Sequence, residues 1–194
     1  MTSDRYARGI EAIDAANRED PAREAYQGQD QPREVAYSLR MTAWLERLEP
    51  TAPEALRLAV RAQHLRRFTI PRDSYPEGRH GYLRWRRDCQ QMHATEAGRV
   101  LEEVGYDPET IDRVQSLVMK RRIQDDPQSQ AVEDTACLVF LESYLGDFSL
   151  KHGEKKVLGI LRKTWRKMSP RARDLALEMD LAQSQKALLK KALA

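Results

Sequence analysis

The chain has 194 residues with nine glycines and nine prolines, which suits one compact domain over residues 1–194. Its hydrophobic fraction of 41% and charged fraction of 32% fit a folded protein with many solvated helix faces and exclude wholesale disorder. The longest strictly apolar run, Cys137 to Leu141, is far shorter than the roughly twenty residues of a membrane span. Cys89 and Cys137 have no paired metal-binding spacing, and the N-terminal residues lack the pattern of an export signal. We therefore expect a cytoplasmic protein with no membrane partner.

The net charge of +3 hides a strong separation of sign along the chain. Residues 61–90 carry eight arginines against three acidic residues, and residues 151–173 carry nine lysines and arginines against Glu154 alone. These two segments have local charges of +5 and +8, so the remainder of the chain is at −10. Segregated charge of this size favours an anionic ligand, because a merely soluble surface usually intersperses the two signs.

Helical periodicity dominates the sequence, and no strand-type alternation of useful length is present. Apolar residues spaced by three and four predict helices, in chain order, over residues 6–17, 35–48, 54–67, 82–105, 108–118, 130–145 and 157–168, with the last helices following 169–170. Residues 23–31, which contain Gly28 and are followed by Pro32, and residues 69–81, which contain two prolines and two glycines, are predicted to be loops. The expected fold class is all-α, a helical bundle with basic C-terminal helices over residues 154–194.

Two sequences predict helix starts from their capping chemistry. Asp107-Pro108-Glu109 places a capping side chain before a proline and an acidic residue, and Ser169-Pro170 repeats the cap and proline. Asp125-Asp126-Pro127 interrupts the chain between two helical patterns.

Three side chains on different predicted helices are candidate ligands of a divalent cation. His64 lies late in the 54–67 helix, His93 on the next long helix, and Asp134 near the start of an apolar helix. Imidazole and carboxylate groups can converge on a metal ion inside a helical bundle, and Mn, Fe or Zn would suit them. The alternative is that each histidine is a hydrogen-bonded structural imidazole and that Asp134 caps a helix.

The order of these elements resembles that of HD-type phosphohydrolases. That resemblance matches His64 to the histidine of the His-Asp pair, His93 to a later histidine and Asp134 to the final aspartate, and it implies an HD-like helical domain with a degenerate motif. Tyr37 stands where the first histidine would be, and Leu65 replaces the aspartate of the pair. The missing aspartate commonly bridges two metals, so the resemblance implies one metal or none.

A closer resemblance covers nearly the whole chain. Its strings are Gln63-His64-Leu65-Arg66-Arg67, Tyr75-Pro76 with Gly81-Tyr82-Leu83-Arg84-Trp85-Arg86, Glu133-Asp134-Thr135-Ala136-Cys137-Leu138-Val139-Phe140-Leu141, and Lys163-Thr164-Trp165-Arg166-Lys167-Met168-Ser169. These strings resemble domain-of-unknown-function family 4202. The resemblance implies that His64-Leu65, rather than His-Asp, is the family's own form of the pair.

Several cations and acids complete the predicted site. Guanidinium groups bind phosphate through a planar fork and ammonium groups bind it as point charges. The candidate phosphate-binding residues are Arg66, Arg67, Arg72, Lys120, Lys163 and Lys167. Glu133 or Glu96 is expected to orient or deprotonate water.

These observations lead to a hypothesis of a metal-dependent HD-like phosphohydrolase acting on a small phosphorylated or nucleotide-like substrate. The alternative is a degenerate HD fold that senses an anion or nucleotide without turning it over. A third possibility, RNA binding through the basic helix and exposed aromatics, is not favoured, because no recognised RNA motif is present and the remainder of the chain is acidic.

Overall fold

Ten α-helices and one small hairpin make up most of the regular structure in the computed structural model, which describes residues 2–121, 123 and 125–194. The elements are α1 (Thr2–Asn17), β1 (Arg23–Tyr26), β2 (Gln29–Pro32), α2 (Arg33–Leu48), α3 (Glu54–Arg61), η1 (Arg67–Thr69), η2 (Arg72–Ser74), α4 (Gly78–Val104), α5 (Pro108–Val118), α6 (Pro127–Val139), η3 (Phe140–Tyr144), α7 (Leu145–Lys151), α8 (Glu154–Lys167), α9 (Pro170–Leu177) and α10 (Gln183–Leu193). The mostly helical fold confirms the predicted all-α class.

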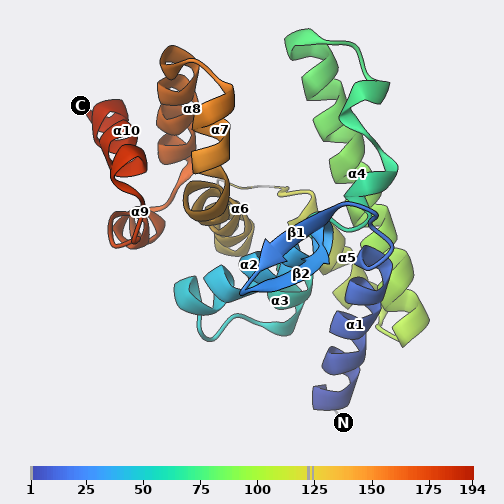
Figure 1. Cartoon of the computed structure of the whole chain (residues 1–194). Coiled ribbons are helices and arrows are strands. Elements are labelled where there is room, and N and C mark those ends of the chain that lie inside the picture. The colour runs from blue at the N-terminus through green and yellow to red at the C-terminus, as the bar shows by residue number, and fades with distance from the viewer. Residues whose placement is uncertain (1, 122, 124) are drawn as a thin grey trace.

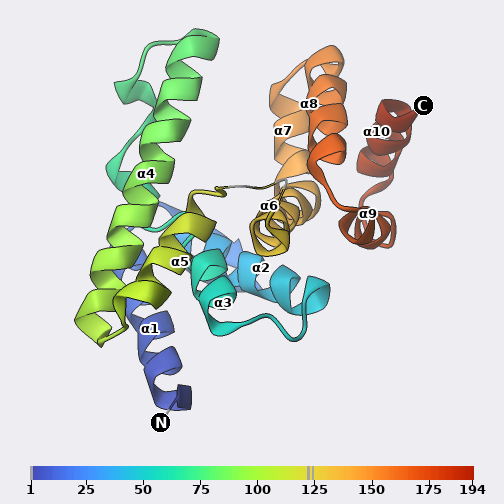
Figure 2. The same cartoon turned by 180° about the vertical axis from the view of Figure 1, so that it is seen from behind.

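The centre of the fold is formed by α2, α3, α5 and α6, which pack on one another (Figure 1). Helix α4 packs on α5 and α1 on one side of this centre, while α8 and α10 pack together on the other. Fully buried leucines such as Leu58, Leu117 and Leu138 join these helices, and each such burial stabilises the fold by about 1.5–3 kcal/mol. Figures 1 and 2 both show the N-terminal half of α4 and the α7–α8 pair extending to the same side of the centre. No helix in the described part of the chain has the length and apolar character needed to cross a bilayer.

The predicted loop over residues 23–31 is instead an antiparallel hairpin, with Arg23 opposite Pro32 and Tyr26 opposite Gln29. Gln27 and Gly28 form its turn, and both have positive φ angles, 50° and 76°. Two-residue turns of this kind match the twist of the strands, and their usual sequence is Asn-Gly or Asp-Gly. Gln-Gly at the turn and polar strands made the hairpin hard to recognise in the sequence.

Three helix boundaries differ from the prediction. Helix α3 ends at Arg61 rather than near residue 67, and His64 lies in the irregular turn that follows. Helix α4 begins at Gly78, inside the predicted 69–81 loop, and the rest of that loop contains η1 and η2. The α6 helix begins at Pro127 and passes into the π-helical η3 at Phe140. The predicted caps at Asp107 and Ser169 are confirmed, since their side chains accept bonds from the amides of Thr110 and Ala172.

A buried ion pair ties α1 to α3. Arg61 donates from Nε to Oδ1 of Asp14 at 2.7 Å and from Nη2 to Oδ2 at 2.5 Å, and it also donates to Thr42 on α2. Both charged side chains are almost fully removed from water. Such a pair is costly to break on one side, because the remaining charge is then buried without a partner.

We expect Arg61→Ala to lower the free energy of unfolding by about 3–5 kcal/mol, since it leaves the Asp14 carboxylate uncompensated. Replacing both partners, Asp14→Leu with Arg61→Met, should cost clearly less than the single change. Urea denaturation of the three variants measures both effects. A single variant as stable as the wild type would show that the pair does not hold α1 in place.

Candidate functional site

Polar side chains from seven parts of the chain form what we call the central cluster. Its members are Glu34 and Tyr37 of α2, His64 after α3, Arg67 of η1, His93 of α4, Lys120 after α5, Glu133 of α6 and Lys167 of α8. Glu34 contacts His64 at 3.3 Å and Arg67 at 3.7 Å, and Glu133 bonds Lys120 and Lys167. Burial lowers the pKa of His64, and the nearby charges of Arg67 and Lys120 lower it further.

His64 and His93 lie together, with ring centroids 5.8 Å apart. The Tyr37 ring stacks on His64 at 3.7 Å between centroids and an interplanar angle of 10°. Burial is the main reason that the pKa of His64 lies well below its usual value and that of His93 is lowered to about 3. Both imidazoles are therefore neutral at pH 7.

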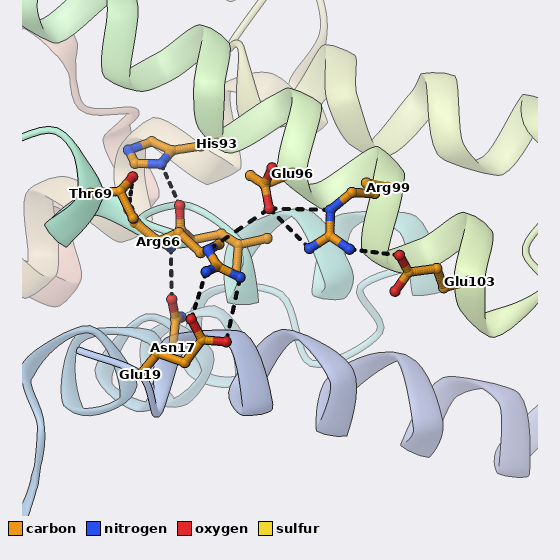
Figure 3. Close-up of polar contacts among 9 residues, drawn as sticks. Asn17, Glu19, Arg66, Thr69, His93, Glu96, Arg99 and Glu103 are labelled. Carbon is orange, nitrogen blue, oxygen red and sulfur yellow. Dashed lines mark hydrogen bonds and ion pairs between the residues drawn. The ribbon is translucent and has the colours of Figure 1, made fainter.

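The Nδ1 atom of His93 is 2.8 Å from the carbonyl oxygen of Leu65, so in the neutral ring it donates that hydrogen bond (Figure 3). This bond fixes the tautomer and leaves the lone pair on Nε2. The Nδ1 atom of His64 is 3.3 Å from Oε2 of Glu34, yet it is buried and has no hydrogen-bond partner of good geometry. The cluster thus contains a free lone pair on Nε2 of His93 and a buried Nδ1 atom of His64 that has no hydrogen-bond partner.

Glu34 is a functional candidate that the sequence analysis missed. Its side chain is only 4% exposed and contacts both His64 and Arg67, with Oε1 at 3.7 Å from Nη1 of Arg67. Burial raises the pKa of this carboxyl group, against the attraction of the Arg67 charge. From the sequence, Glu34 is an acidic residue in the first turn of a helix, where its negative charge interacts favourably with the helix dipole. Only its contacts with His64 and Arg67 in the fold identify it as a candidate.

Glu133, a predicted general base, is held by two cations. Nζ of Lys120 donates to Oε2 at 2.7 Å and Nζ of Lys167 donates to Oε1 at 2.9 Å. Although burial opposes ionisation, these two ammonium groups hold the pKa of Glu133 at about 2. So weak a base is poorly suited to take a proton from water at neutral pH. Its carboxylate fixes the positions of Lys120 and Lys167.

Lys120 has a backbone conformation that lysine rarely adopts. Its φ is 49°, and it closes α5 through bonds from its own amide to the Leu117 carbonyl and from the Arg121 amide to the Ser116 carbonyl. Glycine usually occupies this position after a helix because the left-handed conformation costs other residues about 1 kcal/mol or more. A lysine here directs its side chain toward Glu133.

Asp134, the predicted third metal ligand, is occupied elsewhere. Its Oδ1 atom accepts from the Ser169 amide and from Nε2 of Gln130, both at 2.9 Å, and thereby holds the start of α9. Among the described residues, no three His, Cys, Asp or Glu side chains are arranged to hold a metal ion. His64 and His93 come together as expected, but the arrangement with Asp134 does not fit the three-ligand site.

Glu96 and Arg66 lie in an adjacent open pocket of about 370 Å³, not in the central cluster. Figure 3 shows Glu96 between Arg66 and Arg99, and Arg66 also pairs with Glu19. The remaining predicted phosphate ligands lie outside both sites. Arg72 donates to the carbonyls of Tyr75 and Pro76 and so holds the loop before α4, and Lys163 is exposed on α8 one turn before Lys167.

The neutral burial of His93 predicts a pH dependence of stability. Its pKa is about 3 in the folded chain and near 6.5 when unfolded, so below pH 6.5 the unfolded state binds a proton that the folded state does not. The stability contribution is complete above pH 6.5 and is lost as the pH falls toward 3. We expect the free energy of unfolding to drop by about 2 kcal/mol from this residue between pH 7 and pH 5.

His93→Asn tests this pH dependence, because asparagine can still donate to Leu65 but does not titrate. Its unfolding free energy, measured with urea at pH 7, 6 and 5, should vary less with pH than that of the wild type. Equal pH dependence in both proteins would contradict the assignment of a neutral buried His93.

Comparison with known proteins identifies one family and no individual relative. No curated protein matches the chain, and no solved structure matches it. The family model described as "Domain of unknown function (DUF4202)" matches residues 7–189, which is nearly the whole chain and includes every residue of the central cluster. The chain therefore belongs to this family of domains.

Proposed function

We propose that the central cluster binds the phosphate group of a small phosphorylated, nucleotide-like molecule. The observation that carries this proposal is the gathering of three cations at two buried carboxylates. Arg67 lies 3.7 Å from Glu34, which also contacts the neutral His64. Lys120 and Lys167 both bond Glu133. The cations come from η1 and from the chain at the ends of α5 and α8, which are far apart in sequence. With Glu34 and Glu133 ionised, the cluster has a net charge of +1, and protonation of Glu34 would make it more positive.

The order of charges from the surface inward favours an anion. Glu34 and Glu133 are 4% and 8% exposed, whereas the side chains of Arg67 and Lys167 are 33% and 50% exposed. An anion arriving from solvent therefore meets the cations, with the carboxylates beneath them. Each ammonium group has three donors, so Lys120 and Lys167 can bond Glu133 and a phosphate oxygen at once.

Arg67 is positioned to give a two-pronged contact. Its guanidinium lies over the Trp85 ring at 4.8 Å from the centroid, and its closest approach to Glu34 is a loose 3.7 Å. Stacking orients the planar fork, and the long ion pair leaves hydrogen-bond donors for a phosphate. The strained backbone of Lys120 also supports a functional site, since such strain persists where the surrounding structure requires the side chain.

Calorimetric titration with inorganic phosphate and nucleoside monophosphates tests the proposal. Arg67→Gln and Lys120→Gly should each weaken binding by roughly 10- to 100-fold, the effect of losing one charged hydrogen bond. Lys120→Gly should also unfold at a higher denaturant concentration than Lys120→Ala, because glycine relieves the left-handed strain.

Lys155→Gln, which removes an exposed charge on α8 away from the cluster, is the matched control and should bind like the wild type. Binding that is equally strong in the wild type, Arg67→Gln and Lys120→Gly would place the anion site elsewhere.

Hydrolysis of the bound phosphate ester, in an HD-like phosphohydrolase, is the second candidate function. Tyr37, placed by the HD resemblance where the first histidine would be, stacks on His64, and His93 lies beside them. The carboxylate of Glu34, whose pKa is raised by burial, is a group that can accept a proton from water. The metal-dependent form of this candidate would use His64 and His93 as ligands and needs Asp134 released from Ser169.

Elemental analysis and native mass spectrometry, after growth with Mn, Fe and Zn, test the metal-dependent form. If this form is correct, the wild type should contain about one divalent ion per chain. His64→Ala should lose the ion while its helical circular dichroism stays unchanged. Turnover of a panel of phosphate esters should fall at least about a hundredfold in Glu34→Gln, the scale of losing a general base. If the protein binds phosphate but contains no metal and shows no turnover, anion sensing is the candidate function that remains.

A further inference from the structure

A row of side chains leads along α4 from the exposed Arg79 to the buried His93 of the central cluster. Arg79, Tyr82, Arg86 and His93 are separated by three, four and seven residues, so they lie on one side of the helix. Arg86 stacks over Tyr82 at 6.0 Å from the ring centroid, and its charge is among those that lower the pKa of His64. The row therefore reaches the cluster at its inner end, and Tyr82, which is 43% exposed, provides an aromatic face along it.

A second row leads along α8 to the same cluster. Lys156, Lys163 and Lys167 are separated by seven and four residues and lie on one side of that helix. The row ends at the ion pair between Lys167 and Glu133. The buried residues Val157 and Leu161 face the other way, into the core.

The cations of the two rows are largely free of acidic partners. Arg84 and Arg87 on α4 lie within 4.0 Å of Asp88, and neither belongs to the row. Among the described residues, Arg79, Arg86 and Lys163 have no carboxylate within that distance. A face kept only for solubility would intersperse the signs, whereas the charged side chains of these rows are all cations.

The arrangement of the helices places the two rows on either side of the cluster. In Figures 1 and 2 the N-terminal half of α4 and helix α8 extend to the same side of the central helices, with α6 and the end of α5 between their bases. From Arg79 to His93 the α4 row is roughly 21 Å long at 1.5 Å per residue. This length far exceeds what one phosphate or one mononucleotide can contact.

We propose that the ligand of the central cluster is the end of a single-stranded nucleic acid, whose backbone follows the α4 row with a base stacked on Tyr82, while the α8 row adds charge from the other side. The proposal rests on phosphate binding in the cluster and names the substrate class. Unpaired cations with an interleaved aromatic ring are what single-strand binding uses, since every base has a face that can stack. Charge along the sequence argued against nucleic acid because the remainder of the chain is acidic, but the fold gathers the unpaired cations on both sides of one site.

Fluorescence anisotropy with labelled single-stranded RNA and DNA of about 12 nucleotides tests this proposal, with nucleoside monophosphate as the short competitor. The oligonucleotide should bind at least about tenfold tighter than the monophosphate. Arg79→Gln with Lys156→Gln, one change in each row, should weaken it about tenfold and reduce the salt slope of log K by about 1.4. Tyr82→Ala should weaken it about tenfold. Neither variant should change monophosphate binding.

Lys155→Gln with Arg166→Gln is the matched control, because it removes two exposed charges from the other side of α8. The proposal is supported if the oligonucleotide binds more tightly than the monophosphate and only the row variants weaken this binding. A preference for RNA or DNA then identifies the kind of nucleic acid that is bound. An oligonucleotide that binds no tighter than the monophosphate overturns it and leaves the phosphate site intact. Equal loss in the row and control variants also overturns it, since attraction would then be a property of the whole surface. Failure of the monophosphate itself to bind would instead contradict the proposed function.

Discussion

The ionised carboxylate of Glu133 is the constraint on which the site depends. A buried charge of this kind is stable only when paired, and Glu133 is paired with Lys120 at the end of α5 and Lys167 at the end of α8. The carboxylate on α6 therefore connects the N-terminal helices to the C-terminal ones at one point. The positive face of the central cluster is a consequence, because the cations are held where the buried acid needs them.

Two residues beside the cluster have a left-handed backbone conformation. Arg66 and Lys120 both have positive φ angles, 55° and 49°, without being glycine. At Arg66 the chain turns so that its amide donates to Asn17, while the preceding carbonyl, of Leu65, accepts from His93. Strain at these two positions, of about 1 kcal/mol or more each, is offset by contacts that orient His93 and Glu133.

The helical fold was predictable because its signals are local. Apolar spacing and the caps at Asp107 and Ser169 are properties of adjacent residues, and both were read correctly. The hairpin was not predictable, since Gln27-Gly28 lacks the usual turn residues and its strands bury little apolar surface. The turn that follows α3 was also missed, because the left-handed Arg66 in it donates to Asn17, 49 residues earlier.

The site was predictable in its residue types but not in its geometry. His64 and His93 come together as their helices suggested, yet Glu34 could not be distinguished from a first-turn acid without the fold. The Glu133-Asp134 pair shows the limit most clearly. Adjacent helical residues point about 100° apart, and in the fold Glu133 faces the cluster while Asp134 faces the start of α9. Nothing in the sequence decides which, because both are acids with the same neighbours.

Both acids of that pair, together with Gln130, act on one short segment of backbone. Glu133 binds the Lys167 side chain, Gln130 donates to the Lys167 carbonyl at 2.8 Å, and Asp134 accepts from the Ser169 amide. Three side chains of α6 thus fix the chain where α8 ends and α9 begins, and this fixes the direction in which α8 leaves the cluster. The lysine row on α8 therefore has its position relative to His64 set by α6 rather than by its own sequence. The charge of +8 on residues 151–173 therefore could not identify a function by itself. The position of these cations in the fold depends on where Asp134 and Gln130 hold the end of α8.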